Sequence, residues 1–544
     1  MKTWLRFPPV VWAWLLGGLL FRGVVAWGLP PGFDEAYYYL YSRHLSWSYF
    51  DHPPIAAWTT GLGWWLTGWI APLTIRVGAL LLYTASVALL YRTAVWLFDD
   101  RTGILTVAIA SLTPLFWIAF GTLTAPDNGL IFFWTLTLYL SAREFIPPPN
   151  SRLQPAGTDD YRPSYRIALI GLAVGLACLS KYHGFILGAG LVGFCATNGR
   201  SRRALGSPWI GVALGLCALA LVPVLIWNSQ HDWISFRFQL SARFEGTPAA
   251  AQPFQWLQVL STWLVGVAYL FPSIGFLVWA ALGRSLLQQA RHWVQPPFTL
   301  SERRQRDRDA LILWLSVPIA VGFTLLGGKQ PIYPAWPAPG LWGITLLLAA
   351  WASQWRGVVV RRWLLTSGAA IATLALVAFL HVTVGLLQKP GNYSLFGGFV
   401  APSADGSTAL IDVMQLRSRV AADAPLLAAL RDTDFIFTDE FYLSAYVDMA
   451  LRPLLSQPIT CFSQDPRGFA FWDRSGDWVG QSAVYLTLAS LHPSIDEAAA
   501  EFAPEFDAIA PLDEITLTRG GEPVETLWAY RATALQRPYA FPYP

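Results

Sequence analysis

The chain has 544 residues, of which 54% are hydrophobic and only 13% charged, and its mean hydropathy is +0.41. A soluble domain carries about 25% charged residues, so this composition excludes a soluble enzyme and predicts an integral membrane protein. The formal net charge of +3 gives no support to nucleic-acid binding. The four cysteines share no soluble segment and lack metal-ligand spacing, which argues against a disulfide framework and a structural zinc site.

Apolar runs near the ~20-residue length of a membrane helix recur along the chain up to about residue 387. The first run lacks a small-residue cleavage site, so we interpret it as a retained helix. Eleven spans are predicted, at about 8–29, 73–98, 103–121, 127–145, 166–180, 183–198, 208–228, 256–282, 309–328, 334–353 and 363–387.

Lysine and arginine cluster before odd-numbered spans, namely the first, seventh, ninth and eleventh. Because basic loops stay in the cytoplasm, this places the N-terminus inside and everything after about residue 388 outside. The same topology puts the long loop 30–72 and the turns near 124–127, 181–183 and 327–333 outside. The polar residues that suit chemistry therefore gather on one predicted membrane face.

The first outer loop, FDEAYYYLYSRHLSWSYFDHPP, begins directly after the first span. If Asp34 opens a short helix, then Asp34, Tyr37, Tyr38 and Tyr41 share one face at i, i+3, i+4 and i+7. A carboxylate there suits a general base or a sugar-binding group. An interfacial aromatic belt is the competing interpretation for the tyrosines. Residues 55–70, apolar and rich in tryptophan, predict a second interfacial helix.

Further polar groups lie on the same predicted face. Asp51 and His52 precede two prolines that hold them in an extended turn. Asp127 opens the fourth span, where helix capping is the competing role. Cationic side chains suit a phosphate, although a lone lysine can also snorkel to headgroups. The phosphate-binding candidates are His52, Lys181, Lys329, Arg237 and Arg243.

After about residue 388 the composition becomes that of a soluble α/β domain. DFIFTD (434–439), PITCFS, SAVYLTLAS and the segments around Ile515 and Leu527 predict strands, and EFYLSAYVDMAL predicts a helix. Asp439 and Glu440 lie at a strand-to-helix turn, where open α/β sheets often bind ligands. We favour helix capping by Asp439 as its role. The predicted domains are 1–387 and 388–544.

The first-loop run, followed by TAPDNGLIFFWTLTLYL, LSKYHGFILGAG and WNSQHDWISFRFQ, resembles the bacterial branch of the dolichyl-phosphate-mannose–protein mannosyltransferase superfamily. These are glycosyltransferases of family 39, with RgtA/B/C/D-like and aminoarabinose-transferase-like relatives. The resemblance covers roughly residues 10–400. It implies a polytopic α-helical GT-C fold in the bacterial cytoplasmic membrane, with the C-terminal domain periplasmic.

The resemblance also implies an activity, which is inverting transfer of a sugar from a polyprenyl-phosphate donor to an acceptor hydroxyl. Asp34 matches the family's general base, Asp127 its second acidic position, and Lys181 a lysine that we place at the donor phosphate. The aminoarabinose-type relatives have a lysine where this chain has His52. The substrate-binding candidates are Glu35, Tyr37, Tyr38, Asp51, Tyr182 and His183. No obligatory metal is predicted, although Asp34 and Asp127 could supply oxygen ligands to a divalent ion.

Two other functions remain open from sequence. A flippase or transporter would show repeat symmetry and polar or helix-breaking residues within spans, for which His381 and Pro223 are the only hints. An O-antigen-ligase-like transferase is disfavoured by the acidic motif after the first span. The sequence names neither the sugar nor the acceptor, which lipid A, another glycan or a protein would satisfy.

Overall fold

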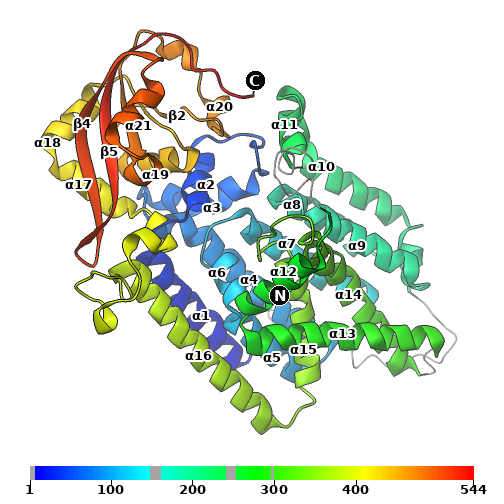
Figure 1. The fold of residues 1–544 in the computed structure, drawn as a ribbon. Helices are drawn as coiled ribbons and strands as arrows, with labels where there is room; N and C mark the ends of the chain where they lie inside the picture. Colours follow the sequence, from blue (N-terminus) through cyan, green and yellow to red (C-terminus); the bar gives the residue numbers. More distant parts are fainter. Residues whose placement is uncertain (1–6, 148–160, 240–252, 296–298, 544) are drawn as a thin grey trace. The chain divides into compact units, whose positions relative to one another are not determined.

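The computed structural model describes residues 7–147, 161–239, 253–295 and 299–543 (Figure 1). The chain packs as two compact units. Unit 1 comprises residues 1–23, 52–56 and 78–373, and unit 2 comprises residues 24–51, 57–77 and 374–544. Packing therefore groups most of the first loop with the C-terminal region. The domain boundary predicted from composition near residue 387 stays a prediction.

Unit 1 is built from α-helices. Segments of α1 (Pro9–Gly28), α4 (Pro72–Leu97) and α16 (Gly357–Val384) belong to it. Helix α8 packs against both α7 and α10, and α14 packs against both α9 and α15 (Figure 1). Its other helices are α5 (Asp100–Leu112), α6 (Pro114–Ala119), α7 (Pro126–Phe145), α8 (Arg166–Ser180), α9 (Gly184–Thr197), η1 (Ser201–Ala204), α10 (Pro208–Gln230), α11 (Ile234–Arg237), α12 (Trp256–Tyr269), α13 (Pro272–Val294), α14 (Leu300–Leu326) and α15 (Ala338–Ala352).

Five helices among the described residues are long and apolar enough to cross a membrane, namely α1, α4, α10, α14 and α16. Four further apolar helices of unit 1, α8, α9, α12 and α15, have 14 or 15 residues each. These helices confirm a polytopic α-helical membrane protein. The total of eleven spans stays a prediction.

Two predicted spans are broken in the structure. The single span expected over about 256–282 is wrong, because α12 ends at Tyr269 and α13 begins at Pro272. Phe271, between them, has a positive φ of 74°, which no helix accommodates, and Pro272 has no N–H for a preceding carbonyl. The span expected over 103–121 divides likewise into α5 and α6 at Thr113, before Pro114.

The helix predicted to begin near Asp34 is confirmed as α2 (Phe33–Arg43), and the second helix of the first loop is α3 (Ile55–Thr67). Helix α2 packs against α19 (Phe441–Leu451) of the C-terminal region. The Tyr446 hydroxyl donates to the Pro31 carbonyl over 2.8 Å, and the Phe33 ring contacts Tyr442 and Tyr446. Within unit 2, α2 is therefore attached to the C-terminal domain by aromatic contacts and by the hydrogen bond of the buried Tyr446.

The C-terminal region forms the predicted α/β domain around a five-stranded sheet of order β2-β1-β3-β5-β4. β1 pairs in parallel with β2 and β3, whereas β3, β5 and β4 pair antiparallel. The predicted strands and helix are confirmed. The elements are α17 (Val413–Ala422), α18 (Ala424–Asp432), β1 (Phe435–Thr438), α19, β2 (Ile459–Cys461), α20 (Phe469–Trp472), β3 (Ala483–Leu488), α21 (Ile495–Phe502), β4 (Phe506–Arg519) and β5 (Glu522–Leu535).

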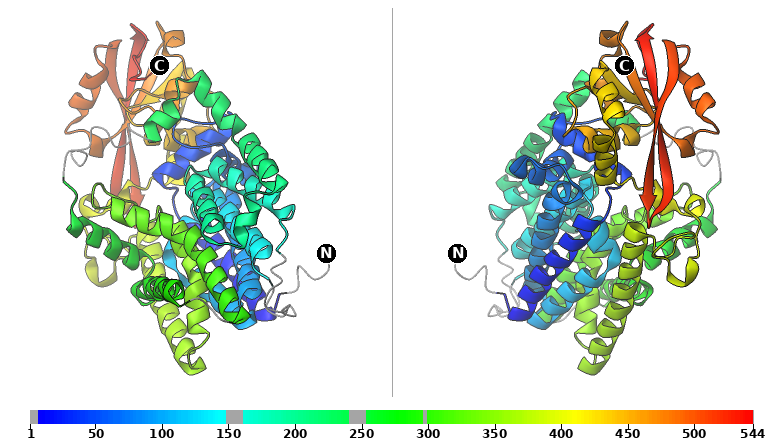
Figure 2. Two further views of the ribbon diagram at one scale, coloured as in Figure 1. Left: turned by 90° about the vertical axis from the view of Figure 1, so that its right-hand side faces the viewer. Right: turned by 90° about the vertical axis from the view of Figure 1, so that its left-hand side faces the viewer.

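Helices cover both faces of this sheet. Figure 2 shows α17 to α19 in yellow on one face and α21 in orange on the other. Phe502 and Ala498 of α21 pack into a core with Phe437, Tyr485 and Tyr530 from three adjacent strands. Burial of large aromatic side chains on this face, each contributing roughly 1.5–3 kcal/mol, fixes α21 over the sheet.

The interpretation of Asp439 as a helix cap is wrong. The N-cap position of α19 is Glu440, and its side chain makes no capping hydrogen bond. The Asp439 carboxylate instead accepts hydrogen bonds from Tyr485 and Thr487 of β3. The side chain is turned towards the neighbouring strand, where two hydroxyls outcompete the backbone N–H groups of the helix.

The structure explains His381 near the end of α16. Its Nε2 lies 3.0 Å from an Asp405 oxygen, and its Nδ1 accepts from the Leu387 N–H over 3.2 Å. Asp405 also binds the guanidinium of Arg519 on β4. This histidine therefore ties the end of a helix to the sheet of the same unit, which removes one of the two hints of a transporter.

Candidate active site

Helix α2 presents Asp34 in its first turn, where the side chain is exposed. The next residue, Glu35, turns inward and its Oε2 accepts from the Gly32 N–H over 2.8 Å, closing the start of the helix. A negative charge in the first turn is favoured by the helix dipole. The sequence Gly-Phe-Asp-Glu thus separates two adjacent carboxylates, one exposed and one buried.

Glu35 forms a buried ion pair with Arg76 of α4. The two Glu35 oxygens accept from Arg76 Nη2 and Nε over 2.6 and 2.8 Å. Arg76 is fully buried and also donates to the carbonyls of Ala26, Leu29 and Pro30. Sequence reasoning missed Arg76, because it lies inside an apolar span. The contacts favour a structural role for Glu35 over the predicted substrate contact.

The predicted tyrosine face of α2 exists, and it is buried. Tyr37, Tyr38 and Tyr41 contact one another with ring centroids 4.9–6.1 Å apart. Tyr37 and Tyr41 are fully buried and Tyr38 is 5% exposed, so these rings form no aromatic belt in the lipid interface. The Tyr37 oxygen accepts from the Gly468 N–H over 2.9 Å, and its ring contacts Phe441 and Trp472.

Asp51 lies at the centre of a polar cluster beside this face. Its carboxylate accepts a short hydrogen bond from the Tyr41 hydroxyl and pairs with Arg467 over 3.2 Å. The guanidinium of Arg467 also stacks over the Phe441 ring at 3.9 Å. Burial disfavours its charge, but the negative charges of Asp51, Asp465 and others, Asp34 included, raise the pKa of Arg467 above its ordinary value. Sequence reasoning missed this arginine, since it stands alone in a loop of the C-terminal domain.

In unit 1 the structure brings Asp127 and Lys181 together. Lys181 Nζ donates to both Asp127 oxygens over 2.9 and 2.8 Å, and the two side chains are only 10% and 9% exposed. Asn128 frees Asp127 for this pair, because its own side chain accepts from the Ala125 N–H and donates to the carbonyls of Phe120 and Leu123.

Close packing of α7 on α8 sets the distance between this acid and this lysine. A Cβ at Gly129 would lie 2.6 Å from Ser180 Oγ and 2.7 Å from a methyl carbon of Ile55. Only glycine therefore lets the start of α7 approach the end of α8, where Lys181 adopts an extended backbone as the C-cap. The sequence placed these two turns on the same membrane face, and the structure adds that their side chains form an ion pair.

The other candidates of unit 1 occupy separate positions. The Tyr182 hydroxyl hydrogen-bonds Ser235 Oγ over 2.8 Å. The His183 ring packs against Phe323 and Trp336. Arg237 ends α11 and is exposed, as is Lys329 in the turn after α14.

The two remaining phosphate-binding candidates are His52 and Arg243. His52 is 8% exposed and belongs to unit 1. Arg243 lies outside the described residues.

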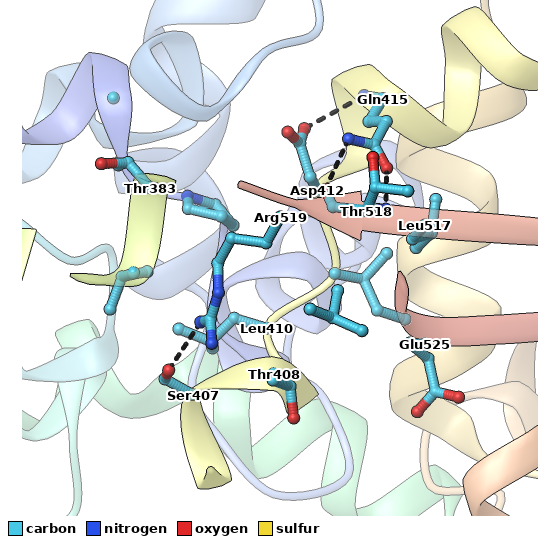
Figure 3. A pocket seen from close by; sticks show the side chains of 15 residues that line it. Thr383, Ser407, Thr408, Leu410, Asp412, Gln415, Leu517, Thr518, Arg519 and Glu525 are labelled. Carbon is cyan, nitrogen blue, oxygen red and sulfur yellow. Dashed lines mark hydrogen bonds between the residues drawn. The ribbon is translucent and has the colours of Figure 1, made fainter. Parts of the chain in front are cut away.

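Two cavities of the described residues lie away from all these candidates. One, of about 80 Å³, lies in unit 2 beside Asp412, Gln415 and Arg519 (Figure 3). Ligand pockets measure roughly 300–1,000 Å³, so this cavity is too small for a sugar. The other, of about 1020 Å³, lies between α9, α13 and α14 and is lined by apolar side chains with Arg202 and Arg306 at its polar side. Neither is lined by a predicted site residue.

The fold is that of a polytopic α-helical membrane protein with acid–cation pairs near helix ends. Residues 51–227 match the family described as dolichyl-phosphate-mannose-protein mannosyltransferase. The chain is 25% identical over 432 residues to the lipid A galacturonosyltransferase RgtD of Rhizobium johnstonii. The alignment covers 77% of each protein.

Crystal structures of ArnT from Cupriavidus metallidurans share the fold. The apo structure has a TM-score of 0.57 at 15% identity, and the structure with undecaprenyl phosphate has a TM-score of 0.60 at 16% identity. Both alignments cover 95% of this chain and 97% of ArnT. The comparisons confirm the predicted resemblance to this superfamily of membrane glycosyltransferases and its GT-C fold.

Proposed function

We propose that this protein is an inverting glycosyltransferase that moves a sugar from a polyprenyl-phosphate donor to a hydroxyl of lipid A. The reaction takes place on the outer face of the bacterial cytoplasmic membrane, with the N-terminus inside. The polyprenyl donor is supported by ArnT, which shares the fold and binds undecaprenyl phosphate. The acceptor is supported by RgtD, which is named for its action on lipid A.

One observation carries the assignment of roles. Three of the four candidate acids, Glu35, Asp51 and Asp127, are buried, with relative exposures of 3%, 3% and 7%. Asp34 is the exposed one. A general base must reach the acceptor hydroxyl and take its proton, which a buried carboxylate does poorly. This contrast favours Asp34 as the base.

The proposed step has a simple balance. Asp34 takes the proton of the acceptor hydroxyl while the oxygen attacks the anomeric carbon from the face opposite the phosphate. The bond between that carbon and the phosphate oxygen breaks, and the polyprenyl phosphate leaves with the electron pair. Attack from the opposite face inverts the anomeric configuration.

Lys181 suits the leaving phosphate. Its ammonium has three N–H donors, and Asp127 takes up two of them across its two oxygens. The third is left to approach a phosphate oxygen, where fixed positive charge stabilises the negative charge that develops as the bond breaks. Asp127 then acts as a positioning residue that holds the lysine. We propose no obligatory metal, since the lysine already compensates the Asp127 carboxylate.

The sugar we favour is galacturonic acid, a hexose derivative, because RgtD is a galacturonosyltransferase. A pentosyl donor is the alternative. The test is transfer from radiolabelled polyprenyl-phosphate galacturonic acid, aminoarabinose or mannose to purified lipid A. The parent protein and Asp34→Asn are compared, with the exposed Glu514→Gln on β4 as the control.

We expect transfer by the parent and by Glu514→Gln, and a loss of about 10²–10⁴-fold in Asp34→Asn with donor binding retained. Equal transfer by Asp34→Asn would remove Asp34 from the reaction. Movement of lipid-linked sugar across vesicles without transfer would replace the proposal by a flippase. An alkaline phosphatase fused after residue 544 should be active, and an inactive fusion would contradict the orientation.

A further inference from the structure

The C-terminal sheet has a switch point that the proposed transfer does not use. After β1 the chain adds β2 on one side, and it later adds β3 on the other side. Both neighbours run parallel to β1. In open α/β sheets of this kind, ligands bind beyond the carboxyl ends of the strands where the order reverses. Asp439 follows β1 directly, and His492 comes shortly after β3.

Three potential metal ligands converge at this point. One ligand atom each of Asp439, His492 and Glu501 lie within 4.8 Å of one another. His492 Nε2 is 2.7 Å from Asp439 Oδ2, and its Nδ1 is 3.9 Å from Glu501 Oε2. Glu501 belongs to α21, and the next residue of this helix, Phe502, is packed in the aromatic core.

The two oxygens of Asp439 have unequal surroundings. Oδ2 accepts from the hydroxyls of Thr487 and Tyr485 over 2.6 and 3.0 Å, in addition to His492. Asp439 is 92% buried, and its Oδ1 has no hydrogen-bond partner among the described residues. An unsatisfied buried carboxylate oxygen is costly. An ion pair with His492 alone explains Oδ2 and leaves Oδ1 unexplained.

We propose that Asp439, His492 and Glu501 bind a divalent transition-metal ion, with Zn²⁺ as the best match. One imidazole nitrogen and two carboxylate oxygens form a ligand set that suits zinc better than magnesium or calcium. Asp439 binds through Oδ1, while Tyr485, Thr487 and His492 Nε2 hold Oδ2, as hydrogen-bonded outer groups commonly orient metal-bound carboxylates. His492 then binds the ion through Nδ1, the nitrogen that faces Glu501.

The site needs only a small closure. Ligands at about 2.0–2.1 Å from a tetrahedral ion lie about 3.4 Å apart. Glu501 is exposed at the end of α21, so its side chain can move inward from its present 3.9 Å separation from His492 Nδ1. Three protein ligands leave the fourth position to water or to an anionic group of a ligand in the crevice.

The test uses the purified full-length protein in detergent, stripped with a chelator and titrated with Zn²⁺ by calorimetry. We expect one saturable equivalent in the parent protein. His492→Ala should abolish it, and Glu501→Gln should weaken it by about 10-fold or more. Glu497→Gln is the matched control, because Glu497 lies one turn earlier on α21 and is exposed. It should bind one equivalent like the parent.

Absence of saturable uptake by the parent would overturn the proposal. So would uptake that His492→Ala and Glu501→Gln leave unchanged, since the metal would then lie elsewhere, or selective uptake of Ca²⁺ over Zn²⁺. A thermal unfolding scan without metal separates binding from folding. We expect Glu501→Gln to unfold like the parent in chelator, and only the parent to gain stability when Zn²⁺ is added.

Discussion

The Asp127–Lys181 pair of unit 1 and the acidic start of α2 in unit 2 place their carboxylates in different surroundings. Asp127 and Lys181 neutralise each other completely, with both carboxylate oxygens on one ammonium. At the start of α2, by contrast, two neighbouring carboxylates differ: Glu35 is buried against Arg76, whereas Asp34 is exposed. Acids of similar type therefore lie in different surroundings, and burial distinguishes Asp34 from Glu35 and Asp127 better than residue type does.

The largest effect is expected from separating Asp127 and Lys181. Lys181→Ala leaves a buried carboxylate without its cation, so it should cost about 3–5 kcal/mol of stability. It should also lower transfer by about 10²–10³-fold, because a group that stabilises the leaving phosphate is lost. Thermal unfolding and the radiolabel transfer assay measure the two effects separately.

The double variant Asp127→Ala with Lys181→Ala is the control for this experiment. It removes both charges, so we expect it to regain most of the stability and none of the transfer. If the double variant also regained transfer, the lysine would serve only to compensate Asp127, and its placement at the donor phosphate would be wrong.

The comparison is sharpened at α2 by changing each acid alone. Glu35→Gln leaves the fully buried Arg76 without its negative partner, and we expect a loss of about 3–5 kcal/mol in the free energy of unfolding. Asp34→Asn should change it by less than about 1 kcal/mol, the usual size of a helix-dipole contribution. Thermal unfolding in detergent checks both. Similar losses in the two variants would show that Asp34 is structural as well.

The last prediction depends on pH and concerns unit 2. Burial raises the pKa of Asp473 to about 7, and Asp473 follows Trp472, whose ring stacks on His44 beside α2. The unfolded carboxyl has a pKa near 4, so the unfolded state loses its proton first as pH rises. Stability therefore falls between about pH 4 and 7 and then levels.

Asp473→Asn removes this titration. We expect its melting temperature to exceed that of the parent at pH 8 and to match it at pH 4, measured by thermal unfolding across that range. A parent profile that rises with pH over this range, or an unchanged difference in Asp473→Asn, would contradict the assignment. Asp465→Asn, at an exposed carboxylate, is the control.

Most helix positions could be predicted because their signals are local. Pro126 and Pro208 open helices where apolar runs begin, and Asp34 lies where α2 was expected to start. The break at Phe271 was missed, since an apolar residue with a left-handed backbone leaves no compositional mark.

The sequence singles out candidate site residues, but it does not predict which of them are buried. The sequence indicates Lys181 and Asp127 as candidates, because ionisable groups at the ends of apolar spans stand out. The fate of Tyr37 was not predictable, since its partners Phe441 and Trp472 lie some 400 residues away in sequence. The capping interpretation of Asp439 failed for the same reason: the hydroxyls that bind it come from another strand.

The attachment of α2 to α19 has a practical consequence for protein engineering. A hybrid made by exchanging only the segment after residue 374 between related enzymes would keep Pro31 and Phe33 from one parent and take Tyr446 and Tyr442 from the other. Its interface would be mismatched at the helix that carries Asp34. Hybrids intended to swap acceptor preference should therefore exchange residues 24–51 and 57–77 together with the C-terminal segment.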